Sequence, residues 1–405
     1  MKFEEVSLED VADITKLAGF EFTKYFQYKE EGDIIAIRGL NVKNGFLDLS
    51  TVKYIDKEVS NSLPRSKLYN NDIVLTYTGS KYGDVALIEK NNKFHLAPNV
   101  AKISIKKNYN PYFYYMVFQS PQFQYYLKNF GVGSGQPTIP MKTIRKIPVP
   151  LPTLEVQDKI ATMMKNINKK VELNNQMIAT LEELAATLFK RWFVDFEFPD
   201  ENGNPYKSSG GKMVDSELGE IPEGWEVTTI GNLMVNFDRK RIPLSKMERS
   251  KRQGEYPYYG AASVMDYVDD FLFDGTYLLL GEDGTVSTSE GYPILQYVYG
   301  KFWVNNHAHV LQGNEDLGIS TEWIKLWFSF QKVSTIITGA VQPKISQKNL
   351  NSMLVVHPSK KITDVFNGII NPFYFKLKNL EVENKILEEI RDLTLPKLIS
   401  GEVVL

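Results

Sequence analysis

Residues 158–193 read DKIATMMKNINKKVELNNQMIATLEELAATLFKRWF and contain the longest regular pattern in the chain. Apolar side chains recur there at alternating spacings of four and three residues. Such a heptad pattern is typical of a helix that buries one stripe against another helix. A helix over residues 154–193 would be roughly 60 Å long, at about 1.5 Å per residue. The stripe consists of Ile160, Met164, Ile167, Val171, Asn174, Ile178, Leu181, Ala185, Leu188 and Trp192.

A second stripe lies 206 residues further along and weakens toward its C-terminal end. It consists of Phe366, Ile370, Phe373, Leu377, Leu380, Asn384, Leu387, Arg391, Thr394 and Leu398. Each stripe contains an asparagine, and a buried asparagine commonly fixes register and partner choice in a coiled coil. We therefore expect the two helices to pair; the alternative is that each packs on its own domain. The positions expected to carry the pairing are Ile160, Ile167, Asn174, Ile178, Leu181, Leu188, Leu377, Leu380, Asn384 and Leu387.

Other segments repeat at the same offset, which indicates a tandem duplication. Residues 133–142, GSGQPTIPMK, match residues 339–348, GAVQPKISQK, at an offset of 206. The starts of the two halves match at an offset of 222, where Phe3-Glu4 corresponds to Trp225-Glu226. Each half reads as short β-rich segments, then an aromatic helix near 112–128 or 321–336, then a long helix.

The sequence therefore predicts an α+β protein with a pseudo-two-fold internal repeat. Two tandem, mixed and β-rich α/β domains would be separated by two long antiparallel coiled-coil helices. The predicted parts are a first domain over 1–150, a central helix over 151–196, a linker over 197–221, a second domain over 222–358 and a C-terminal helix over 359–405. The linker is expected because residues 198–212 are polar and rich in turn-forming residues.

Composition excludes several classes of protein. The chain has 405 residues, of which 43% are hydrophobic and 24% charged, so disorder does not describe it as a whole. It has no cysteine, which excludes disulfide frameworks and thiolate metal sites. The N-terminal residues are polar and acidic, and no run of about 18 apolar residues occurs. We therefore expect a cytoplasmic protein with no membrane contact.

A catalytic site is not evident. The chain has no G-x-x-x-x-G-K-[ST] phosphate loop. Asn371-Pro-Phe-Tyr374 and Asn110-Pro-Tyr-Phe113 resemble the Asn-Pro-Pro-Tyr box of adenine methyltransferases, but the second proline is missing. No glycine loop for S-adenosylmethionine precedes either copy, and Asn110-Pro111 reads as an ordinary helix N-cap. His307 and His309 lack evident further metal ligands. We expect a non-catalytic chain without a cofactor or metal of its own.

The distribution of charge along the chain limits the segments that could bind nucleic acid. The net charge of −2 is not that of a nonspecific DNA binder, although residues 1–150 are net basic. Groove contacts favour Arg, Lys, Asn and Gln, while Thr and Ser contact phosphates. The shared Gln-Pro loops are one set of candidates, with a stiff turn as the alternative: Gly133, Gln136, Thr138, Gln342 and Lys344. The variable segments supply the other set, with a solvated surface as the alternative: Arg38, Lys43, Thr78, Ser80, Lys81, Tyr82, Arg239, Lys240, Arg241 and Lys246.

Four further segments carry a resemblance to a known family. They are residues 181–196, LEELAATLFKRWFVDF; 218–225, LGEIPEGW; 305–311, NNHAHVL; and 395–401, LPKLISG. With the tandem halves, these segments follow one another as they do in the specificity (S) subunit of type I restriction–modification systems. The chain resembles that family over essentially its whole length.

The resemblance implies two target recognition domains, each reading one half of a split sequence in double-stranded DNA. It also implies that the two helices hold the domains apart and dock two modification subunits. Those partners would bind S-adenosylmethionine and methylate adenine, and two restriction subunits, which use ATP and Mg, could join them. The sequence leaves two other functions open. One is a tandem coiled-coil adaptor for protein or glycan, and the other is an enzyme that itself modifies DNA.

Overall fold

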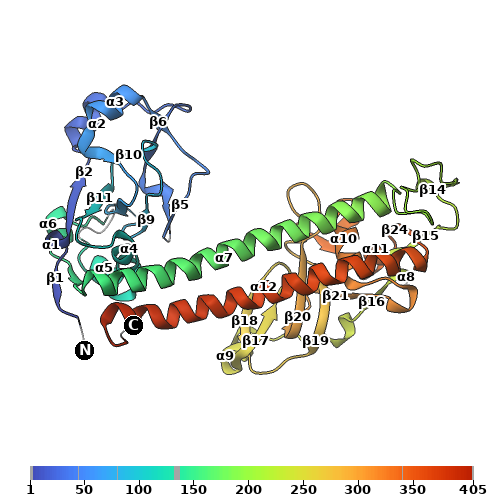
Figure 1. The fold of residues 1–405 in the computed structure, drawn as a ribbon. Helices are drawn as coiled ribbons and strands as arrows, with labels where there is room; N and C mark the ends of the chain where they lie inside the picture. Colours follow the sequence, from blue (N-terminus) through green and yellow to red (C-terminus); the bar gives the residue numbers. More distant parts are fainter. Residues whose placement is uncertain (1–2, 44, 80, 132–136, 340, 404–405) are drawn as a thin grey trace. The chain divides into compact units, whose positions relative to one another are not determined.

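The computed structural model describes residues 3–43, 45–79, 81–131, 137–339 and 341–403 (Figure 1). The chain divides into two compact units. The first unit consists of Met1–Leu173 with Glu383–Leu405, and the second of Asn174–Val382. The unit boundaries cut through both long helices, so each unit contains one part of each helix in addition to its globular part. The predicted domain bounds, in contrast, set the helices apart from the domains.

The first unit contains two four-stranded sheets. One has the order β2-β11-β8-β9, formed by Ala12–Lys16, Val100–Ile105, Ile73–Thr76 and Val85–Leu87. The other has the order β6-β3-β10-β7, formed by Tyr54–Ile55, Ile34–Ile37, Phe94–Leu96 and Lys67–Leu68. The short pairs are β1 with β12 (Glu5–Ser7, Pro148–Pro150) and β4 with β5 (Val42–Lys43, Phe46–Leu47). The helices are α1 (Leu8–Val11), α2 (Gly19–Tyr25), α3 (Lys57–Ser62), α4 (Pro111–Gln119), α5 (Pro121–Asn129) and α6 (Met141–Arg145).

The aromatic helix expected near 112–128 is two helices, α4 and α5. The Asn110 side chain accepts a hydrogen bond from the Phe113 amide at 3.0 Å, and Pro111 occupies the first turn of α4. This confirms the N-cap interpretation of Asn110. Ser120 ends α4 and caps α5 by accepting from the Phe123 amide at 3.3 Å. The helix breaks there because Pro121 lacks the amide hydrogen that would continue it.

The second unit is built around a six-stranded sheet. Its order is β16-β21-β19-β20-β17-β18, formed by Met234–Asn236, Ala308–Gly313, Phe273–Gly281, Leu295–Val304, Gln253–Tyr259 and Val264–Val268. The paired strands outside it are β13 with β14 (Met213–Ser216, Gly219–Pro222), β15 with β24 (Glu226–Thr229, Leu354–His357) and β22 with β23 (Ile337–Thr338, Lys344–Ile345). Its short helices are α8 (Ile230–Leu233), α9 (Lys246–Lys251), α10 (Thr321–Ser329) and α11 (Gln347–Asn351). Trp323 of α10 is among the largest fully buried side chains and belongs to the main core of this unit.

The predicted repeat is visible in the elements themselves. Helices α1 and α8 each span four residues and follow β1 and β15, the first strands of the two matched halves. Helices α6 and α11 each span five residues, at the offset of 206 found in the sequence. Strand β1 pairs antiparallel with β12, as β15 does with β24. The two units therefore share their first and last elements, and the segments between these elements differ.

The segment predicted as a linker is an ordered part of the second unit. Phe198 is buried and stacks on Trp225, with ring centroids 4.9 Å apart, and on Tyr206 at 4.6 Å. Ile221, at the end of the β13–β14 hairpin, belongs to the same core. The segment predicted as a linker over 197–221 thus packs on the second unit, because a few aromatic side chains anchor an otherwise polar segment.

The long helices are α7 (Leu154–Phe189), followed by a π turn over Lys190–Val194, and α12 (Lys360–Ser400) (Figure 1). Every position of both predicted stripes is buried or half-buried. In the first unit, Asn168 and Arg391 are hydrogen bonded at 3.3 Å. In the second unit, the Phe189 and Phe366 rings lie 6.0 Å apart, and both belong to the domain core. Within each unit, the helices therefore contact each other and also pack on the globular part.

Candidate nucleic-acid interface

In the first unit, the end of the Gln-Pro loop lies against the segment that follows β8. The Ile139 amide donates to the Tyr77 carbonyl at 2.8 Å, and the Gly79 amide donates to the Pro137 carbonyl at 3.1 Å. The hydroxyl oxygens of Thr138 and Thr78 lie 3.2 Å apart. The structure thus brings together two of the predicted side chains. The predictions for Ser80, Gly133 and Gln136 fall outside the described residues.

The second unit repeats this arrangement with other side chains. The Ile345 amide donates to the Glu282 carbonyl at 2.8 Å, and the Gly284 amide donates to the Pro343 carbonyl at 3.0 Å. The Lys344 ammonium lies 3.2 Å from the Glu282 carboxylate and is half-exposed. Gln342, next to it in the loop, is exposed. The matching Gln-Pro segments therefore make matching backbone hydrogen bonds in the two units.

A third backbone hydrogen bond completes each arrangement. The Tyr77 amide donates to the Asn99 carbonyl at 3.0 Å, and the Glu282 amide donates to the His307 carbonyl at 2.8 Å. We call residues 77–79, 99 and 137–139 the first clamp, and residues 282–284, 307 and 343–345 the second clamp. Gly79 and Gly284 occupy matching places with φ of +102° and +80°, a backbone region that glycine adopts at low cost. The two clamps therefore have the same backbone hydrogen bonds but different exposed side chains.

A buried charge network fixes the second clamp to the sheet. Arg241 donates to the Glu282 carboxylate at 2.6 Å and to the Ala308 carbonyl at 2.7 Å. The Asp238 carboxylate accepts from the Val310 amide at 2.8 Å and lies 2.6 Å from His309 Nδ1. Burial acts to raise the pKa of Asp238, but its hydrogen bonds with His309, Val310 and Asn236 and the charge of His309 together outweigh burial, so this pKa is lowered.

The same network contains three side chains of metal-ligating type. Ligand atoms of Asp238, Glu282 and His309 lie within 4.8 Å of one another. The Arg241 guanidinium also lies against both carboxylates, at 2.6 Å from Glu282 and 3.6 Å from Asp238. It supplies the positive charge that these carboxylates require when buried. This arrangement is explained as an ion-pair network, and the expectation of no resident metal stays a prediction.

In the basic segment of the second unit, some side chains are exposed and one is held by partners within the protein. Arg239, Lys240 and Lys246 are exposed, as predicted for contact with a large ligand. Arg241, in contrast, has its donors committed to Glu282 and to backbone carbonyls, and its side chain is 12% exposed. Contact of Arg241 with DNA would require it to leave these partners, so this assignment stays a prediction.

The candidates of the first unit divide in the same way. Arg38 donates to the Thr51 carbonyl at 3.0 Å, and Lys43 forms an ion pair with Asp48. Contact of either side chain with DNA would require it to leave these partners, so both assignments stay predictions. Lys81 is exposed beside the first clamp. The Tyr82 hydroxyl donates to the Lys128 carbonyl at 3.4 Å, so it is held within the domain.

The sequence did not mark two exposed side chains: Asn99, which belongs to the first clamp, and Lys16, which lies beside it. Asn99 precedes β11 with a φ of +71°, a conformation that Asn adopts more readily than most residues. The Lys16 ammonium lies 5.4 Å from the centre of the Tyr77 ring. No motif marks either residue, because their proximity to the Gln-Pro loop arises from the pairing of β2, β11 and β8.

The long helices also present apolar side chains on their outer faces. In the first unit, Ile386, Ile390 and Leu393 of α12 are exposed at helical spacing. In the second unit, Met177 and Leu184 of α7 are exposed, at nearly half of each side chain. These positions lie between the buried stripe positions in the sequence. Each helix therefore has exposed apolar side chains in addition to its buried stripe. An exposed apolar face of this kind is typical of a protein–protein contact.

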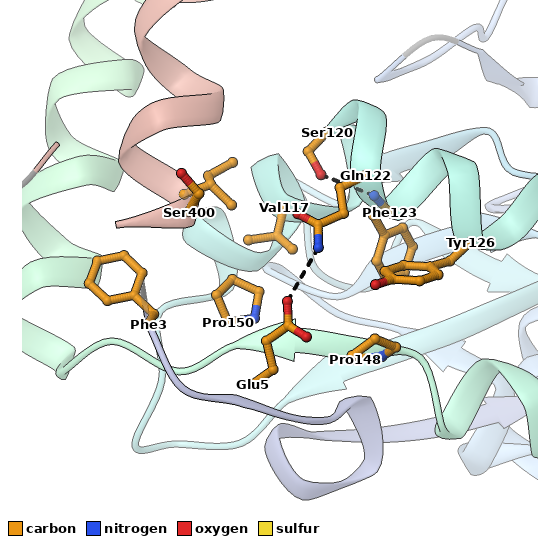
Figure 2. Close-up of a pocket in the computed structure, with 11 residues that line it drawn as sticks. Phe3, Glu5, Val117, Ser120, Gln122, Phe123, Tyr126, Pro148, Pro150 and Ser400 are labelled. Carbon is orange, nitrogen blue, oxygen red and sulfur yellow. Dashed lines mark hydrogen bonds between the residues drawn. The ribbon is translucent and has the colours of Figure 1, made fainter. Parts of the chain in front are cut away.

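A hollow of about 380 Å³ lies in the first unit, at the β1–β12 pair and the end of α12 (Figure 2). Its walls include Phe3, Phe123 and Pro150, and Gln122 donates to the Glu5 carboxylate at 3.2 Å. The Glu5 carboxylate would repel a phosphate group. This hollow is therefore not a candidate for contact with the nucleic-acid backbone.

A family model described as "Type I restriction modification DNA specificity domain" matches residues 1–183 and 222–392. The MjaIX specificity subunit of Methanocaldococcus jannaschii is 25% identical over 314 residues, covering 72% of this chain and 68% of that protein. The HindI specificity subunit of Haemophilus influenzae is 21% identical and covers 99% of each chain. A crystal structure of a type I S subunit from M. genitalium has a TM-score of 0.63 at 16% identity, covering 98% of this chain and 96% of that one. In the described part of the chain, no helix is long and apolar enough to cross a membrane.

Proposed function

Since the chain belongs to the family of type I restriction–modification DNA specificity subunits, we propose that it binds a bipartite site in duplex DNA, each unit reading one half. The observation that carries this proposal is the pair of clamps. Their backbones make the same three hydrogen bonds, while their side chains differ. Two similar surfaces with different side chains suit a duplex, whose backbone is regular and whose bases vary.

Exposed cations around each clamp would contact the DNA backbone. Lys16 and Lys81 are exposed in the first unit. In the second unit, Asp238 and Arg241 fix the ends of the turn that carries Arg239 and Lys240. This turn therefore stands beside the second clamp with two exposed cations. Such side chains position a protein on phosphates without reading sequence.

The long helices would set the distance between half-sites and dock two modification subunits. Their outer apolar faces, which include Ile386, Ile390 and Leu393 on α12, support this assignment. A continuous helix resists bending, so the length of the unread gap would follow from helix length. Pairing through Asn174 and Asn384 stays part of this proposal, and both side chains are buried.

The chain would carry out no chemistry itself. S-adenosylmethionine would be bound by the modification subunits, and ATP and Mg by restriction subunits where these are present. Two features support this division: Asn110 is occupied as a helix cap, and Asn371 lies inside α12. The complex would act on chromosomal DNA in the cytoplasm.

Methylation mapping tests this function directly. The chain is co-expressed with its cognate modification subunit in a host free of adenine methylation, and methylated bases are mapped by single-molecule sequencing. We expect a split motif with methyladenine in both halves, absent when this chain is omitted. A stable complex that leaves the genome unmethylated would contradict the proposal.

Binding of the purified complex to duplex DNA separates this function from that of an adaptor. Neutralising several phosphates makes the association constant fall steeply with salt concentration. An adaptor for protein or glycan would show no such dependence. Methyl transfer by this chain alone would instead favour the third possibility, an intrinsic enzyme.

A further inference from the structure

We propose that Asn99 and His307 are specificity-determining residues, each reading a base of the half-site bound by its own unit, and that Asp283 is a positioning residue for His307. The inference rests on the proposed function and assigns residues to it. Asn99 and His307 occupy matching places in the two clamps, since each accepts the same backbone hydrogen bond, from Tyr77 and Glu282 respectively.

The Asn99 side chain is available to a ligand. Asn99 is exposed, and its amide group makes no hydrogen bond to any residue that the structure describes. The Tyr77 amide holds its carbonyl at 3.0 Å, and the residue has a φ of +71°. The backbone is therefore fixed while the amide group is free. An asparagine side chain can both donate to and accept from adenine in the major groove.

His307 is fixed more firmly. Its backbone amide donates to the Asn305 side chain at 2.8 Å, and its ring nitrogen Nδ1 pairs with the Asp283 carboxylate. The imidazole is 45% exposed, and within the described residues Nε2 has no hydrogen-bond partner. One nitrogen therefore orients the ring and the other is left for a ligand, which is how anchored imidazoles commonly present a polar group.

The charges around the two residues differ in a way that bears on which base is read. Thr78 and Thr138 of the first clamp carry no charge. The second clamp, in contrast, contains the charged residues Asp283, Lys344 and Glu282, with Lys344 half-exposed. A lysine or a protonated imidazole donates to N7 and O6 of guanine, whereas asparagine favours adenine. The two clamps thus offer different hydrogen-bonding patterns on the same backbone, so we expect the two half-sites to differ at the base each clamp reads.

The test is methylation mapping of five variants, each co-expressed with the modification subunit. Asn99→Gly removes the amide group and keeps the left-handed backbone, which glycine adopts readily. Asn92→Gly is its matched control, since Asn92 is also exposed with a positive φ, of 56°. His307→Ala removes the imidazole, and His357→Ala, on β24, is its control. Asp283→Asn tests the positioning role separately.

We expect Asn99→Gly to relax one position in one half of the motif and His307→Ala to relax one position in the other half. A good base contact discriminates roughly 5- to 150-fold between bases, so non-cognate sites should become methylated to that extent. Asp283→Asn should relax the same position as His307→Ala, but by less. The control variants should keep the wild-type motif.

Several results would overturn the inference. The first is an unchanged motif in both Asn99→Gly and His307→Ala, and the second is relaxation of the same half by both variants. Loss of all methylation by a complex that still co-purifies would also count against it, because a reader of one base should relax one position. A wild-type complex that gives no split motif contradicts the proposed function instead, so the two failures are distinguishable.

Discussion

Replacing Arg241 with methionine separates the two roles that its place in a basic run leaves open. In the structure, its guanidinium lies between Glu282 and Asp238, whose side chains are 13% and 7% exposed. Removing one partner from a buried ion pair costs about 3–5 kcal/mol, because the remaining charge stays buried and unpaired. Glu282 keeps Lys344 at 3.2 Å. We therefore expect a loss of about 3 kcal/mol in the free energy of unfolding of the second unit.

Tryptophan fluorescence is a suitable assay for this loss. All five tryptophans, Trp192, Trp225, Trp303, Trp323 and Trp327, lie in the second unit. Their emission during urea unfolding therefore follows that unit without a contribution from the first. With a urea dependence of about 2–3 kcal/mol per molar, a loss of about 3 kcal/mol lowers the midpoint by about 1–1.5 M.

Arg239→Met is the matched control, because Arg239 is exposed and pairs with no described residue. We expect the control variant to unfold at the wild-type urea concentration and to bind DNA with a shallower salt dependence, reduced by about one phosphate contact. The structural role of Arg241 would be refuted if Arg241→Met unfolded like the wild type and weakened DNA binding as the control does.

Three further predictions address the linker segment, the buried aspartate and the helices. Phe198→Ala should destabilise the second unit by about 3–5 kcal/mol in the same fluorescence assay, whereas Leu218→Ala, at an exposed position of that segment, should leave the midpoint unchanged. Asp238 has a lowered pKa in the folded unit, so it stabilises the unit above its unfolded pKa of about 3.9, and this contribution is lost as the pH falls through the folded value. Urea midpoints measured between neutral pH and pH ~3 should fall less for Asp238→Asn than for the wild type; an equal fall would assign the acid sensitivity to other groups. Inserting one helical turn in both α7 and α12 adds about 6 Å, and motif mapping should then show a gap longer by about one or two base pairs; an unchanged gap would remove the helices as the ruler.

The long helices and the repeat could be predicted because each produces a regular pattern of residue types along the sequence. The period of the apolar stripe depends on helix geometry alone, and every predicted stripe position is buried or half-buried. The Gln-Pro segments were found because their residues match in type and spacing, and the structure gives them matching hydrogen bonds. The N-cap at Asn110 was also predictable, since a cap and the proline after it are neighbours in sequence.

What could not be predicted depends on partners distant in sequence. Arg239 and Arg241 are two residues apart, yet one is exposed and the other is enclosed by Glu282 and Ala308. Nothing in the basic run marks that difference. Phe198 lies in a polar, turn-rich segment, and its burial arises from stacking on Trp225, which lies beyond the β13–β14 hairpin. Long-range pairs of this kind are fixed by tertiary packing, which local composition does not report.

The clamps show how a duplicated domain can change what it reads without changing its fold. Their three shared hydrogen bonds join backbone amides to backbone carbonyls, so they place no demand on the side chains of Asn99 or His307. The demands on residue type come from positive φ: at Gly79 and Gly284, where glycine adopts it at low cost, and at Asn99, where histidine is tolerated as asparagine is. Side chains exposed on such a frame can be exchanged at little cost in stability, because surface substitutions away from caps and buried pairs usually change it by under about 0.5 kcal/mol. It follows that exchanging the two reading residues, Asn99→His with His307→Asn, should alter the motif far more than the folding of either unit.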